Sequence, residues 1–108
     1  MQFDHLAFEA NDIAAAVEFY RELLPELRLL YRDDTWALIE ASGVKIAFVK
    51  LGEHPAHMAF RVVSHEELER EAAKHNVSIS IHRDKSESIY VNDPSGNAIE
   101  IIWYPKTD

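Results

Sequence analysis

Apolar and polar residues alternate at the start of the chain, where FDHLAFEA covers residues 3–10. Such alternation is typical of a half-buried strand. Asn11 and Asp12 follow as candidate helix N-caps. Behind them, four apolar residues recur at helical spacing: Ile13, Val17, Tyr20 and Leu24. We therefore expect a helix over residues 12–24, after the opening strand.

Three short segments rich in strand-forming residues come next, at residues 27–33, 35–41 and 44–50. Turn residues separate them, and Ser42-Gly43 precedes the third segment. Closely spaced strands with turns between them are typical of an antiparallel meander. This part of the chain thus predicts the element order strand, helix, strand, strand, strand.

The same order then begins again, with an opening strand at residues 56–63. Ser64 and Glu67 form a capping box, which predicts a helix through residue 76. Three more strands are expected, and the turn DPSG precedes the last of them. Their ranges are residues 77–83, 86–92 and 97–105.

Sequence similarity between the halves supports an internal repeat. DHLAF at residues 4–8 aligns with AHMAF at 56–60, and GVKIAF at 43–48 aligns with GNAIEI at 96–101. We predict an α+β fold of two βαβββ modules. Neither module can cover both faces of its strands alone, so the modules are expected to pack together, with helices on one face and a concave opposite face. The module ranges are about 1–51 and about 55–105, within one domain, 1–108.

Composition narrows the possible chemistry. The 108 residues include no cysteine, so a metal would be held by histidine and carboxylate ligands, and a cytoplasmic location is the default expectation. The formal net charge is −8, and no basic stripe interleaved with aromatic residues occurs, so we expect no nucleic-acid partner. No basic leader with an apolar segment and no membrane-length apolar run is present, so we expect no membrane association.

Alternation along the strands places His5, His57 and Glu100 together on the concave face. The opposite set is expected to pack beneath the helices: Leu6, Phe8, Met58, Phe60, Val62, Ile99, Ile101 and Trp103. Two imidazoles and one carboxylate suit a divalent first-row metal and leave coordination positions open to substrate. The alternative is a buried hydrogen-bonded cluster of the same three residues without a metal.

At these positions the chain resembles the vicinal oxygen chelate superfamily, which includes glyoxalases, bleomycin-resistance proteins, extradiol dioxygenases and fosfomycin-resistance proteins. The resemblance rests on DHLAFEANDIAAAVEFYRELL, HMAFRV and IYVNDPSGNAIEI, and it extends over essentially the whole chain. It implies the glyoxalase/bleomycin resistance/dioxygenase fold. It also implies metal ligands at His5, His57 and Glu100, the set that strand alternation selects.

One position departs from the glyoxalase pattern. Glyoxalase I members carry a fourth ligand, a glutamate, where the internal alignment places Ala47. The chain therefore looks more like the three-ligand branches. It is shorter than typical extradiol dioxygenases, and it lacks the basic C-terminal extension of the fosfomycin enzymes.

Further residues of the concave face are candidates for substrate contact. Tyr90 is expected to hydrogen-bond an oxygen-rich substrate, and we also assign it a catalytic role beside Glu100; the alternative is a tyrosine that only fills the face. Arg61, Lys45 and His82 would receive an anionic group, or they are solvated charges at the rim. Other inward positions are Ser88, Asn92, Trp36 and Leu38, and no role is assigned to His54, His65 or His75.

Two function classes follow. The first is a metalloenzyme whose bound ion chelates vicinal oxygens of a small substrate. Its reaction would be that of a glyoxalase-like lyase or isomerase, a fosfomycin-type thiol transferase or a dioxygenase. The ion would be Fe, Mn, Ni, Zn or Co. The second is a non-catalytic protein that sequesters a small molecule, as bleomycin-resistance proteins do. Those proteins generally lack the metal ligands, so the intact set of His5, His57 and Glu100 argues against this second class. The resemblance also implies a homodimer with the site at or near the subunit interface.

Overall fold

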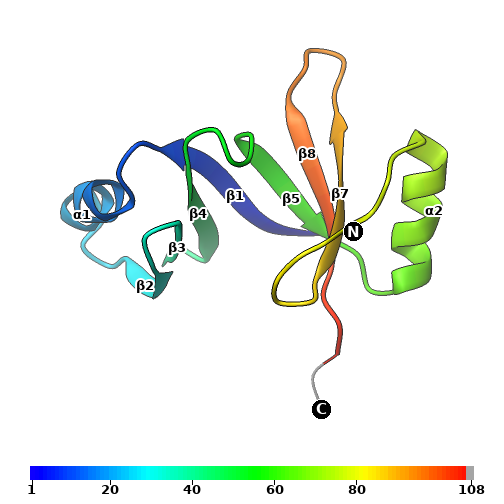
Figure 1. The fold of residues 1–108 in the computed structure, drawn as a ribbon. Helices are drawn as coiled ribbons and strands as arrows, with labels where there is room; N and C mark the ends of the chain where they lie inside the picture. The colour runs from blue at the N-terminus through cyan, green and yellow to red at the C-terminus, as the bar shows by residue number, and fades with distance from the viewer. Residues whose placement is uncertain (107–108) are drawn as a thin grey trace. The chain divides into compact units, whose positions relative to one another are not determined.

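The computed structural model describes residues 1–106, and the predicted βαβββ order occurs twice (Figure 1). The first module consists of β1 (Gln2–Ala10), α1 (Ile13–Leu23), β2 (Arg28–Arg32), β3 (Trp36–Ala41) and β4 (Val44–Lys50). The second consists of β5 (His57–Arg61), α2 (His65–His75), β6 (Ser80–Ile81), β7 (Glu87–Asn92) and β8 (Ala98–Trp103). The strands form one mixed sheet in the order β2-β3-β4-β1-β5-β8-β7-β6. The α+β fold class is therefore confirmed.

Both predicted helix caps are confirmed. The Asp12 carboxylate accepts the backbone N–H of Ala15 at 3.0 Å, and the Ser64 hydroxyl accepts that of Glu67 at 3.1 Å. Each cap satisfies one of the backbone donors that have no partner inside the helix. The caps fix where each helix begins relative to the strand that precedes it.

Strand β6 is much shorter than the predicted segment 77–83. Asn76 ends α2 in the left-handed conformation, and the N–H of Val77 donates to the carbonyl of Ala72 at 3.0 Å. Val77 and Ile79 then pack against the core beneath α2. Since these apolar side chains complete the helix end and its core, only Ser80 and Ile81 pair with β7.

Close contacts divide the chain into two compact units, which are described separately. One contains residues 5–57, and the other contains residues 1–4 together with those from 58 onward. That the whole chain acts as one domain with a concave face remains a prediction.

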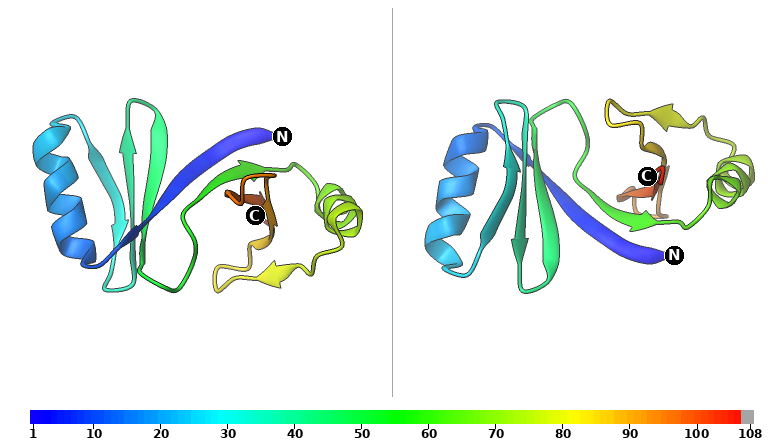
Figure 2. Two further views of the ribbon diagram at one scale, coloured as in Figure 1. Left: turned by 90° about the horizontal axis from the view of Figure 1, so that it is seen from above. Right: turned by 90° about the horizontal axis from the view of Figure 1, so that it is seen from below.

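In the unit that contains α1, the helix packs against β3 and β4 (Figure 2). Its core consists of Ile13, Val17, Ala37, Ile39 and Phe48. Leu6 and Phe8 pair with Ile46 and Phe48, so they lie on the helix side of the sheet. However, neither belongs to the core, and Phe8 is 43% exposed. The prediction that they pack beneath the helix is wrong, because α1 lies over β3 and β4 and not over β1.

The unit that contains α2 repeats this arrangement. Its core consists of Val62, Leu68, Ala72, Ile89 and Ile101, with Trp103 packed against it. Met58 is 38% exposed, and neither it nor Phe60 is part of this core. Their predicted place beneath the helix is wrong for the same reason, since α2 packs against β7 and β8. In both units the helix covers the later strands of its module.

The faces away from the helices carry the predicted inward residues. Ala47 pairs with Ala7 in β1 and with Leu38 in β3, while its neighbours Ile46 and Phe48 lie on the α1 side. In the other unit, Tyr90 pairs with Glu100. Paired residues share a face, so the alternation predicted for β4, β7 and β8 is confirmed.

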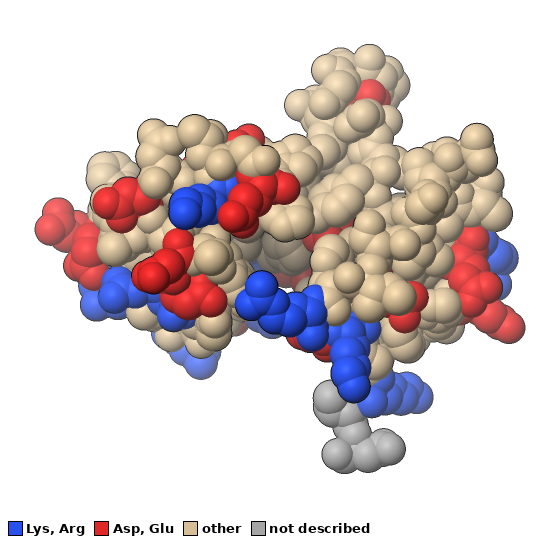
Figure 3. Space-filling model, viewed as in Figure 1, with Lys and Arg blue, Asp and Glu red and all other residues tan. Residues whose placement is uncertain are grey.

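No helix within residues 1–106 is long and apolar enough to cross a membrane. On the α1 unit, acidic and basic side chains are interspersed over the face drawn in Figure 3.

Candidate metal centre

Glu100 lies in the middle of β8 and is only 3% exposed. The preceding turn sets its position. Asp93 accepts the backbone N–H groups of Ser95 at 2.8 Å and Asn97 at 2.9 Å. Hydrogen bonds from the Asn97 side chain and backbone hold the pKa of Asp93 below its ordinary value. This tight turn returns the chain in register, so Tyr90 of β7 lies opposite Glu100 of β8.

Tyr90 is half-buried and interacts directly with Glu100. Burial, the charge of Glu100 and a hydrogen bond to its carboxylate raise the pKa of Tyr90 above its ordinary value. The hydroxyl therefore stays protonated and donates to the carboxylate. This donation stabilises the ionised form of a carboxylate that is almost completely buried.

His82 also lies beside Glu100. Its Nε2 is 2.7 Å from the hydroxyl of Ser88 and 3.6 Å from Oε2 of Glu100. Ser88 is fully buried on β7. Sequence reasoning treated His82 only as an anion receptor or a rim charge and missed this contact. Its sequence signal is the pair of histidine and serine six residues apart across a hairpin.

His5 and His57 lie close together, with ring centroids 5.5 Å apart at an interplanar angle of 74°. His57 is buried, and its Nδ1 lies 2.7 Å from the carbonyl oxygen of Pro55. A carbonyl only accepts hydrogen bonds, so Nδ1 of His57 carries the proton. In the neutral ring, the lone pair is then on Nε2, which is how metal-binding histidines are commonly oriented.

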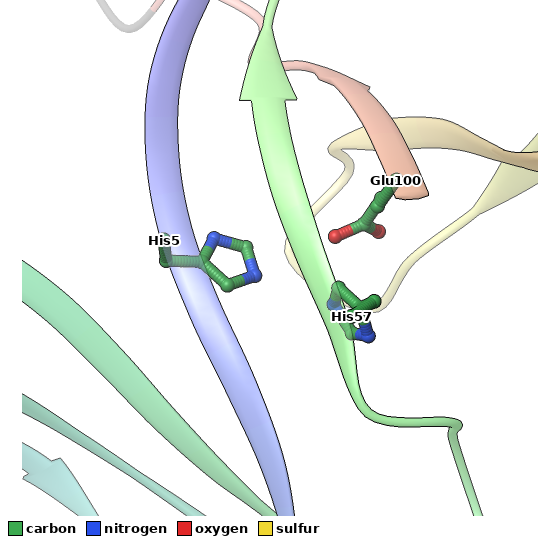
Figure 4. Close-up of side chains that lie close together, drawn as sticks. All are labelled: His5, His57 and Glu100. Carbon is green, nitrogen blue, oxygen red and sulfur yellow. The ribbon is translucent and has the colours of Figure 1, made fainter. Parts of the chain in front are cut away.

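His5, His57 and Glu100 form a group that could hold a metal ion (Figure 4). Each offers one ligand atom, and these atoms all lie within 4.8 Å of one another. The side chains come from β1, β5 and β8. Two imidazoles with a buried carboxylate are a donor set that suits divalent first-row metals. The residues therefore fit such an ion.

The remaining predicted site residues are placed as follows. Arg61 is exposed and donates to Oε1 of Gln2 at 2.8 Å. Trp36 stacks on Tyr31 with ring centroids 4.6 Å apart. Lys45 is exposed on β4 and faces away from α1, since it is two residues from Ala47 on the same strand.

His65, to which the sequence assigned no role, joins α2 to β7. Its Nδ1 is 2.6 Å from Glu69 and its Nε2 is 2.8 Å from Glu87. Its ring packs edge-on against Trp103. The hydrogen bond to Glu87 is the largest cause that raises the pKa of His65, and Glu69 adds to it. The contact secures the helix to the sheet.

Solved structures share this fold. A glyoxalase/bleomycin resistance protein/dioxygenase superfamily member from Vibrio splendidus 12B01 matches with a TM-score of 0.71 and 14% identity, over 93% of this chain and 97% of that one. Hypothetical protein BH1468 from Bacillus halodurans C-125 matches with a TM-score of 0.75 and 19% identity, over 99% of this chain and 96% of that one. At these identities the likeness establishes the fold.

The 2,3-dioxygenase LapB from Pseudomonas sp. KL28 matches with a TM-score of 0.66 and 23% identity, over 97% of this chain but 43% of its own. No curated protein matches the sequence. The glyoxalase-like domain family matches residues 5–102, which is most of the sequence and includes all three candidate metal ligands. The chain therefore belongs to the glyoxalase-like domain family.

Proposed function

We propose that this protein is a divalent-metal-dependent enzyme of the vicinal oxygen chelate type that acts on a small, oxygen-rich substrate. The observation that carries the proposal is the group of His5, His57 and Glu100, whose ligand atoms lie within 4.8 Å of one another. When bound, the ion would act as a Lewis acid toward oxygens of the substrate. The neighbouring residues orient the ligands and bind the rest of the substrate.

Each ligand has support for this role. The hydrogen bond to Pro55 fixes the tautomer of His57, and Tyr90 donates to Glu100. For Tyr90 we propose a second task, the donation of a hydrogen bond to a substrate oxygen during turnover. Glu100 is almost completely buried, and electrostatic interactions there are stronger than in water.

For substrate recognition we propose Lys45, Arg61 and Trp36. Lys45 and Arg61 would bind an anionic group, and the Trp36 ring would form an apolar wall. The sequence also predicts that Ser88 contacts substrate. Because Ser88 is fully buried and lies 2.7 Å from His82, we propose instead that it supports His82.

The test is metal binding by protein purified without chelators. Elemental analysis should find about one divalent ion per site. Calorimetric titration with Mn²⁺, Co²⁺, Ni²⁺ and Zn²⁺ should show that Glu100→Gln lowers affinity by more than about 100-fold, since even residues behind the ligands change affinity by about 10–100-fold. His75→Ala on the exposed face of α2 is the matched control and should bind normally. Equal affinity of wild type and Glu100→Gln would refute the site.

Metal identity and substrate screening separate the reaction types. Iron would favour oxygenase chemistry, whereas nickel, zinc or manganese would favour the lyase, isomerase or transferase branches. The metal-loaded protein is then screened against small compounds with vicinal oxygens. Tight binding without turnover of every ligand found would favour the sequestering function instead.

As the alternative to a site built from the single-chain group of His5, His57 and Glu100, we propose a homodimer in which the equivalent ligands come from two chains. Mixing a His5→Ala chain with a Glu100→Ala chain should then rebuild one intact site per heterodimer and recover metal binding. A monomer by light scattering, or no recovery after mixing, would contradict shared sites.

A further inference from the structure

His82 lies on the hairpin between β6 and β7, and the backbone of this hairpin is tightly closed. The N–H of His82 donates to the carbonyl of Ser86 at 2.8 Å, and the N–H of Lys85 donates to the carbonyl of His82 at 2.9 Å. The Asp84 carboxylate accepts both the backbone N–H and the hydroxyl of Ser86. The backbone of His82 therefore has one well-defined position.

The side chain of His82 is fixed as well. Its Nε2 lies 2.7 Å from the hydroxyl of Ser88, which is fully buried on the neighbouring strand. The same nitrogen lies 3.6 Å from Oε2 of Glu100. Nε2 of His82 is therefore held against the Ser88 hydroxyl, next to the Glu100 carboxylate.

Within its own unit, Glu100 thus lies beside the Tyr90 hydroxyl and Nε2 of His82. They come from different places, since Tyr90 lies on β7 and His82 on the hairpin before it. A buried carboxylate that contacts two such side chains has little freedom to rotate. Its orientation before any ion binds is therefore set by these groups.

We propose that His82, held by Ser88, is a positioning residue that orients the Glu100 carboxylate for metal binding. This inference rests on the proposed function, because it assigns His82 a purpose only if Glu100 is a ligand. A purely structural role would be to attach the hairpin to β7, with no effect on the ion.

The experiment uses Co²⁺ as the probe, because its visible absorption reports on the ligand geometry. His82→Ala and Ser88→Ala should each lower Co²⁺ affinity by about 10–100-fold and change the absorption spectrum. His82→Gln retains an N–H donor and should recover part of the affinity. His75→Ala on α2 is the matched control. Melting of the metal-free proteins shows whether each variant is folded.

The possible failures are distinguishable. If the wild-type protein binds no Co²⁺, the proposed metal site is refuted, and the role of His82 is refuted with it. If the wild-type protein binds Co²⁺ while folded His82→Ala has the same affinity and spectrum, only the positioning role is overturned. A loss in His82→Ala that His82→Gln partly restores supports the proposal.

Discussion

The two modules have the same strand pairing but carry different chemistry at equivalent positions. In the first, Leu38 of β3 pairs with Ala47 of β4. In the second, Tyr90 of β7 pairs with Glu100 of β8. Both pairs face away from the helix of their unit, yet one is apolar and the other is a hydrogen-bonded tyrosine and carboxylate. The fold tolerates either pair, so the backbone supplies the position and the side chains supply the chemical difference.

The largest expected effect concerns what the modules share, their cores. Ile39 in the first core and Leu68 in the second are both fully buried. Ile39→Ala and Leu68→Ala should each lower the free energy of unfolding by about 2–5 kcal/mol, through lost burial and the cavity that remains. Denaturant unfolding measures the loss. If the chain is one domain, both variants shift one common transition; two separate transitions would contradict the single-domain prediction.

The next prediction makes the first module resemble the second. Ala47→Glu places a carboxylate at the position equivalent to Glu100, on the face opposite α1. We expect Mn²⁺ affinity to rise by about 10-fold, because a hard ion gains an oxygen ligand. Calorimetric titration gives the affinity, and thermal melting with and without metal gives the stability.

Ala37→Glu is the matched control, since Ala37 is fully buried on the α1 side of the same sheet. It should lose stability by several kcal/mol and gain no affinity, because the new carboxylate would be buried without a partner. If Ala47→Glu behaves like this control, Ala47 does not have the position of an additional ligand.

The smallest expected effect is pH-dependent and specific to the second module, where His65 joins α2 to β7. The pKa of His65 is raised from its ordinary value of 6.5, so its stabilising contribution is complete below that pH and is lost as the pH rises through the raised pKa. Wild type should melt a few degrees above His65→Gln at about pH 6, and the gap should shrink at about pH 9. A gap that is constant or grows with pH would contradict the contact.

Much of this arrangement could be predicted from local pattern. Alternation correctly placed Tyr90 and Glu100 on one face, because the tight turn from Asp93 to Asn97 keeps β7 and β8 in register. The helix caps at Asp12 and Ser64 could be predicted for the same reason, because each side chain bonds a backbone N–H only three residues further along the chain. These features depend on residues a few positions apart, which a sequence pattern describes directly.

Other features depend on where a helix lies over the sheet, which periodicity does not specify. Phe8 and Met58 have the alternation of core residues but are exposed, because each helix covers the later strands of its module. The contact of His82 with Ser88 was missed for a related reason. Alternation placed both residues on the inward face, but His82 follows the two-residue strand β6, so the pattern did not indicate that its side chain reaches Ser88.

The most direct test of the central claim counts the imidazole ligands on the bound ion. X-ray absorption spectroscopy of the Zn²⁺-loaded protein distinguishes histidine from water and carboxylate by scattering from the outer atoms of the ring. We predict two imidazoles at about 2.0 Å in the wild type and one in His5→Ala. No imidazole in the wild type, or two in both His5→Ala and His57→Ala, would contradict it.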